Sequence, residues 1–223
     1  MLRCQKTTEG SVRLAGAENA DQRSVNPHVL TLAHDRRSGW RAKKAQLSGN
    51  PLTKEQVAVY RAVLGDYTKE VEDSLNLDSK TEPLDRSGHF FDDGCAEGLE
   101  LENTSVPMIH HLDRRVVTSS KIVLADGDRQ QKTIAENDPQ NLVKKAVEGH
   151  ENVSDKQLKD SVTQAINTGL FTFSEIAFDK PHRHAVVSYA FVCGGLCGHS
   201  NTVVLKKNRR TWKIINTCGG WIS

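Results

Sequence analysis

The stretch that decides the fold is the last quarter of the chain, residues 170–223, which reads LFTFSEIAFDKPHRHAVVSYAFVCGGLCGHSNTVVLKKNRRTWKIINTCGGWIS. Four runs in it are rich in β-branched and aromatic side chains, which favour strands: residues 171–178, 185–193, 202–205 and 212–215. Short polar or glycine-rich segments separate the runs, as in hairpins. Because consecutive strands with short connections usually pair, we predict a four-stranded antiparallel meander.

The second run, residues 185–193, shows no alternation of polar and apolar side chains. A strand that is apolar on both sides is usually covered on both faces of its sheet. We expect the helix just before the sheet to cover one face. An amino-terminal helix or a second copy of the chain, in a homodimer through the sheet, is expected to cover the other.

Upstream of the sheet, the sequence has several helix patterns. Residues 51–75 begin with a capping-box spacing at Thr53 and Gln56 and continue with an apolar stripe. Three further helices are predicted: Arg129 to Glu136, Asp138 to about Val147, and Ser154 to Gly169. Their apolar side chains are expected to face inward, namely Leu142, Val143, Ala146 and Val147, then Leu158, Val162, Ala165 and Ile166.

Between these helix patterns, residues 76–97 are polar and are predicted to be a loop. Weak strand patterns follow at Leu99 to Leu101 and Val116 to Leu124. Together the patterns predict an α+β domain over residues 51–223, with helices packed on the carboxy-terminal meander.

The first 50 residues differ in composition from the remainder. They hold nine Lys or Arg and four Asp or Glu, a net +5, and show no hydrophobic period. We predict a disordered basic leader. Binding to nucleic acid is not predicted, because no folded basic platform accompanies these residues. No apolar run approaches a membrane span of about 20 residues, and MLRCQKTTEG lacks the apolar region of a signal peptide.

Four of the five cysteines, Cys95, Cys193, Cys197 and Cys218, lie in the predicted domain. An even number there and an extra Cys4 outside is the pattern of two disulfides and one free thiol. Cys197 bonded to Cys193 or to Cys218 would close the loop between the second and third strands.

Two other chemistries fit part of the same cluster. Cys193, Cys197, His199 and Cys218 are candidate zinc ligands, although structural zinc sites usually use two close pairs. Cys197 and His199 are a candidate thiolate–imidazole pair. We favour a structural disulfide over a metal site, and a metal site over catalysis. No cofactor is predicted.

The remainder of the chain has none of the common catalytic motifs, such as GxSxG, HExxH or a phosphate-binding loop. The sequence therefore favours a non-enzymatic, extracytoplasmic binding or interaction module that is stabilised by disulfides, with no particular partner indicated. One alternative is an enzyme or small-ligand binder with a pocket between the curved sheet and its helices, using Glu175, His184 or Tyr189. Another is a cytosolic protein stabilised by zinc.

The ending also carries a resemblance. The segments AVVSYAFVCGGLCGHS, VVLKKNRRTWKII and CGGWIS are similar to those of an uncharacterised group of bacterial proteins that end in FxCGxLCG, LxK, WK and W[IV]S. Members of that group look like exported proteins, so the resemblance implies a periplasmic or secreted location and supplies no catalytic residue. In architecture, the predicted helices and meander resemble the cone-shaped nuclear transport factor 2-like and cystatin-like domains, which serve many functions.

Overall fold

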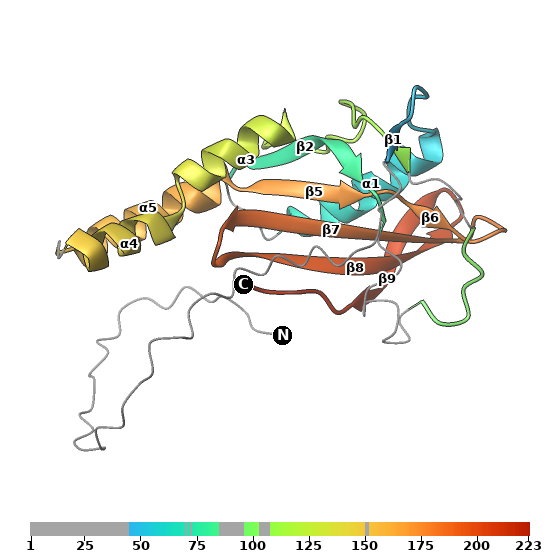
Figure 1. Ribbon diagram of the computed structural model, residues 1–223. Helices are drawn as coiled ribbons and strands as arrows, with labels where there is room; N and C mark the ends of the chain where they lie inside the picture. Colours follow the sequence, from blue (N-terminus) through green and yellow to red (C-terminus); the bar gives the residue numbers. More distant parts are fainter. Residues whose placement is uncertain (1–44, 70, 72, 85–95, 103–107, 150–151) are drawn as a thin grey trace, which may run out of the picture. The chain divides into compact units, whose positions relative to one another are not determined.

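The computed structural model describes residues 45–223 except 70, 72, 85–95, 103–107 and 150–151, and all of these belong to one unit, Ala42–Ser223 (Figure 1). The helices are α1 (Lys54–Tyr67), α3 (Gly127–Glu136), α4 (Pro139–Gly149) and α5 (Asp155–Thr168). The strands are β1 (Gln46–Leu47), β2 (Leu75–Glu82), β3 (Met108–Ile109), β4 (Ile122–Ala125), β5 (Leu170–Ser174), β6 (Ala177–Phe178), β7 (His184–Gly194), β8 (Cys197–Asn208) and β9 (Thr211–Cys218). Helices and a mostly antiparallel sheet make this an α+β fold, as the sequence predicted.

The main sheet contains the predicted meander and two additional strands. Its order is β4-β2-β5-β7-β8-β9, with β6 pairing to β7. Strands β5, β7, β8 and β9 are successively antiparallel, which confirms the meander. Strand β2 pairs in parallel with both β5 and β4, so the prediction of a loop over residues 76–82 was wrong. The strand pattern of β2 is weak because this strand is rich in polar residues. The register of its pairing with β5 also shifts between Leu77 and Thr81.

Helix α1 covers one face of the main sheet. Its predicted capping box is present, with the Thr53 hydroxyl accepting from Gln56 N and the Gln56 side chain accepting from Thr53 N. The buried side of α1 packs on Phe171 and Phe173, which are both fully buried in β5. The helix ends at Tyr67 rather than near Leu75, because Leu75 is already the first residue of β2.

The opposite face of the sheet is covered differently from the prediction. Val186, Val204 and Cys218 form a small cluster there with the segment 96–101, and α3 packs near β5 and β7 through the buried Ile134. The helix just before the sheet, α5, buries only Ala165, and α4 buries no residue. These two helices instead lie side by side as a hairpin that extends beyond the end of the sheet (Figure 1).

The folded part begins before residue 51. Strand β1 pairs in parallel with β3, and Ser48 N donates to Ile109 O at 2.7 Å. The remainder of the predicted leader, residues 1–44, lies outside the described residues. Among the described helices, none has the length and apolar character needed to span a membrane.

Candidate functional site

The first feature of the site is the junction between the start of α4 and the loop that joins β7 to β8. The Asp138 carboxylate accepts from Gln140 N at 2.9 Å, which caps the helix, and from Gly195 N at 2.7 Å. A Cβ atom at Gly195 would lie 2.6 Å from the Gln140 side-chain oxygen, so a larger residue there would displace the flexible end of that side chain. The loop is therefore held against the first turn of α4.

A disulfide closes the same loop. Cys193 and Cys197 are bonded, with their Cα atoms 5.1 Å apart, and Cys193 is buried in the sheet. Of the two partners left open for Cys197, the structure selects Cys193. Leu196 lies inside this closed loop and is 73% exposed. Because both ends of the loop are fixed, Leu196 is presented on a rigid support beside the helical hairpin.

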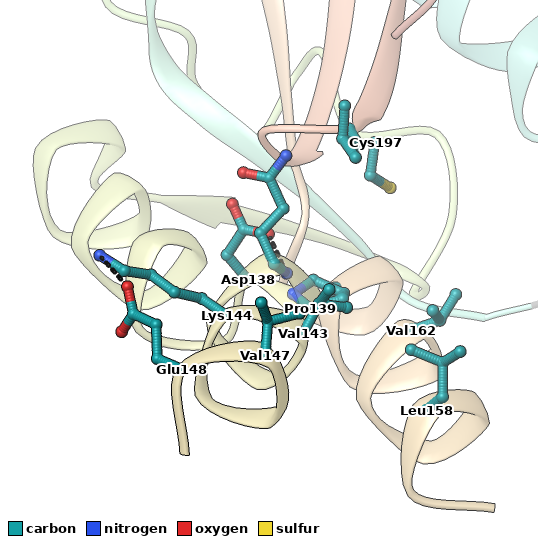
Figure 2. A pocket seen from close by; sticks show the side chains of 12 residues that line it. Asp138, Pro139, Val143, Lys144, Val147, Glu148, Leu158, Val162 and Cys197 are labelled. Carbon is teal, nitrogen blue, oxygen red and sulfur yellow. Dashed lines mark hydrogen bonds and ion pairs between the residues drawn. The ribbon is translucent and has the colours of Figure 1, made fainter. Parts of the chain in front are cut away.

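The helical hairpin and the loop enclose an apolar hollow of about 640 Å³, which we call the hairpin groove. Figure 2 shows Val143 and Val147 on α4 across from Leu158 and Val162 on α5. These side chains are 40–70% exposed, although they are aliphatic. The complete lining is Asp138, Pro139, Gln140, Val143, Lys144, Val147, Glu148, Leu158, Val162, Ala165, Leu196 and Cys197.

The charged side chains in this lining already have partners. Lys144 and Glu148 approach each other at 3.9 Å along one side of α4 (Figure 2). The Asp138 carboxylate accepts from the backbone N–H groups of Gln140 and Gly195. The hairpin groove therefore offers apolar surface without an unpaired charge. Such a surface favours an apolar occupant over a charged one.

The structure does not assemble the predicted zinc ligands into a metal site. Cys193 and Cys197 are bonded to each other, Cys218 is also disulfide-bonded, and disulfide sulfurs are not thiolate ligands. The ring of His199 stacks on that of Tyr67 at 5.8 Å, and burial lowers the pKa of His199. Across the described part of the chain, no three metal-ligating residues gather. Cys95 lies outside the described residues.

The three predicted pocket residues lie apart from one another. The Glu175 carboxylate accepts from the Thr81 hydroxyl and, at 2.9 Å, from His110 N. The same carboxylate is paired with His110 Nδ1 at 2.9 Å, and both side chains are less than 15% exposed. This pair links β2, the end of β3 and the segment after β5. Neither Glu175 nor His110 lines the hairpin groove.

The other two pocket residues have different surroundings. His184 Nδ1 lies 2.8 Å from the Asp179 carboxylate, which also accepts from His184 N and so holds the turn before β7. The ring of Tyr189 packs against Phe171 and Tyr67 on the α1 side of the sheet. Tyr189 nevertheless contributes to the lining of a second hollow, described next.

The second hollow, which we call the sheet groove, lies over β5, β7 and β8. It consists of adjoining spaces of about 200 Å³ and 470 Å³ that share Glu82, Thr172, Ala190 and Trp221. Helix α3 contributes Gln131, Ile134 and Ala135 to its wall. Sequence reasoning missed this groove. The sequence feature that could have indicated this groove is the row of small or polar side chains that alternate with the core residues of the strands.

Comparison with known proteins gives no relative to guide the assignment. No protein-family model matches this chain. No curated protein matches it at a significant level. No solved structure matches it at a significant level either.

Proposed function

We propose that this protein is a non-enzymatic interaction module and that the hairpin groove docks an amphipathic helix of another polypeptide. The observation that carries the proposal is an aliphatic stripe, formed by Val143, Val147, Leu158 and Val162, left exposed on a pair of packed helices. Side chains of this kind normally become buried, and exposed contiguous apolar patches commonly mark interaction sites.

The shape of the groove favours a helix as occupant. Helices α4 and α5 form two walls, and the loop carrying Leu196 forms an end. A third helix lying between two helices buries its own apolar stripe, with anchors about one turn apart. A volume of about 640 Å³ has room for several aliphatic side chains, whereas two flat surfaces pressed together would leave little space to fill.

The disulfide supports the same proposal. The bond between Cys193 and Cys197 limits the motion of Leu196, so little conformational entropy would be lost when a partner covers it. We further propose that Cys218 is bonded to Cys95 and that the protein functions in an oxidising compartment, where such bonds persist.

The test uses a synthetic helix of about 18 residues. It carries leucines at positions i, i+3, i+4 and i+7, and a control peptide of the same composition has its leucines scattered. Fluorescence anisotropy measures binding of each peptide to the whole protein. We expect the patterned peptide to bind, and Val147→Asp to weaken its binding by at least about tenfold. The matched control is Val123→Asp, since Val123 is 50% exposed but lies on β4, outside the groove lining.

Three outcomes would contradict the proposal. Equal binding of both peptides would show that the surface does not select a helical stripe. Equal weakening by Val147→Asp and Val123→Asp would place binding elsewhere. A dimer in sedimentation that Val147→Asp dissociates would show that a second copy of this chain, and not a partner helix, occupies the groove.

A further inference from the structure

The sheet groove is a separate concave surface that the proposed docking of a helix does not use. It lies on the face of the sheet opposite α1, and its lining is more polar than that of the hairpin groove. Four residues with hydroxyl groups line it from three neighbouring strands, namely Thr172, Ser188, Ser200 and Thr202, and the hydroxyls of Ser188 and Thr202 are hydrogen-bonded to each other at 2.7 Å. A hollow of this size, with several polar groups converging on it, is typical of small-molecule sites.

The charge in this groove has one sign. Among the lining residues that the structure describes, the charged ones are Glu82 and Asp138, and neither Lys nor Arg contributes. The Asp138 carboxylate is already occupied by Gln140 N and Gly195 N. For the Glu82 carboxylate, no hydrogen bond or ion pair is formed within the described part of the chain. Among the described residues, the Glu82 carboxylate is therefore left without a partner and can pair with a ligand.

An aromatic surface accompanies this carboxylate. The segment after β9 pairs with the start of β8, where Ser200 N donates to Trp221 O at 2.9 Å. A Cβ atom at Gly198 would lie 3.0 Å from two atoms of the Trp221 ring, so the glycine lets the indole lie close against the strand. Trp221 is held in this position by the backbone pairing and is still 41% exposed.

We infer that the sheet groove binds a small organic cation, with its ammonium group at Glu82 and its apolar body against the indole of Trp221. A carboxylate supplies charge pairing for an ammonium group, and the face of an indole attracts a cation or an alkyl ammonium stem. An anionic ligand is disfavoured by the uncompensated carboxylate.

The electrostatics of Glu82 agree with this inference. Burial raises the pKa of the Glu82 carboxyl, although Glu82 as a whole residue is exposed, and the nearby Asp78 carboxylate raises that pKa further. A carboxylate without a cationic neighbour, as Glu82 is among the described residues, behaves in this way. A bound ammonium group would provide the missing partner.

The experiment compares three ligands with the same aromatic body: benzylamine, benzyl alcohol and benzoate. Each is titrated into the full protein at neutral pH, and chemical shifts of the Trp221 indole N–H report binding. We expect benzylamine to bind at least about tenfold more tightly than benzyl alcohol, and benzoate to bind most weakly. Glu82→Gln should abolish the preference for the amine. Glu97→Gln, an exposed glutamate outside the groove lining, should preserve it.

Equal affinity for benzylamine and benzyl alcohol would overturn the inference, as would tighter binding of benzoate. An amine preference that survives Glu82→Gln would assign the charge recognition to another residue and would also overturn it. The Val147→Asp variant should bind benzylamine normally, because Val147 lies in the other groove. The proposals for the sheet groove and for the hairpin groove can therefore be contradicted independently of each other.

Discussion

Helix α1 and the α4–α5 hairpin carry similar apolar stripes and have opposite environments. In α1, Val59, Tyr60 and Leu64 are completely buried against the sheet. In the hairpin, Val143 and Val147 are at least half exposed, and Ala165 is the buried exception. The contrast shows that a helical stripe predicts an apolar face but not the surface that covers it. We propose that a stripe that the rest of the described chain leaves open is a surface for a partner.

The largest expected effect is on the free energy of unfolding when one side chain of each apolar stripe is truncated to alanine. Leu64→Ala removes a completely buried side chain and should cost about 2–5 kcal/mol. Val147→Ala should change stability by less than about 0.5 kcal/mol, because Val147 is 70% exposed and alanine favours the helix. Urea denaturation of both variants measures the difference. A loss of several kcal/mol for Val147→Ala would show that the hairpin stripe is part of the core.

A smaller effect on stability is expected from removing the disulfide in the loop between β7 and β8, beside the helical hairpin. Replacing Cys193 and Cys197 together by alanine should cost about 2 kcal/mol, since the disulfide closes a short loop. Thermal unfolding measures the loss, and it should disappear when both proteins are compared under reducing conditions. Unchanged stability would mean that the disulfide has no structural role.

A count of free thiols is the control for this pair of variants. The wild-type protein, denatured without reductant, should show one reactive thiol among its five cysteines. The double variant should also show one. A higher count in the wild type would contradict the proposed bond between Cys218 and Cys95.

The smallest expected effect concerns pH and the attachment of α1 to the turn before β7. Glu55, in the first turn of α1, lies 2.9 Å from His182 Nδ1 and also pairs with Lys207. Burial alone would raise the pKa of Glu55, but hydrogen bonds from Lys207 and His182 lower it overall. The hydrogen bond to Glu55 in turn raises the pKa of His182.

The sign of each shift defines a pH window. The stabilisation from Glu55 is complete above the pKa of an unfolded glutamate, about 4.3. It is lost as pH falls through the lowered pKa of Glu55 in the folded protein. The contribution of His182 is complete below about pH 6.5 and is lost as pH rises through its raised pKa. We therefore expect this attachment to contribute most between about pH 4.5 and 6.5.

Unfolding measured across this range in wild type and His182→Gln tests the expectation. The variant should lose about 0.5 kcal/mol of stability near pH 6, a small amount because the pair is partly exposed. The loss should be smaller near pH 9, because His182 is then neutral in both the folded and the unfolded protein. A loss that grows with rising pH would contradict the assignment. Glu148→Gln gives a comparison on the hairpin, where the partner Lys144 is 70% exposed and removal of the pair should have almost no effect.

Local features of the sequence were predicted most accurately. The capping box at Thr53 and the helix starts at Asp138 and Ser154 were recognised, because a cap depends on residues within one turn. The meander was recognised for a similar reason, since its strands follow one another through short connections. Strand β2 was missed because its polar sequence becomes a strand only when β4 and β5 pair on either side.

The candidate sites depended more on tertiary structure. The sequence indicated that Cys193 and Cys197 belong to a disulfide cluster, but it left their pairing open. Glu175, His184 and Tyr189 were grouped as one pocket, and the structure gives each a different environment. Glu82 and Trp221 were not singled out, because nothing in their local sequence shows that they line the same groove.

The sequence by itself determined the type of each strongly patterned element, the helix caps and the antiparallel order of the last strands. These depend on side chains close together in the chain, where hydrogen bonding and apolar periodicity act directly. Only the tertiary structure decided that α1 is buried and α4–α5 exposed, and that Glu82 and Trp221 share a groove. Burial depends on which distant surfaces meet, because apolar area is removed from water only by contact with another surface.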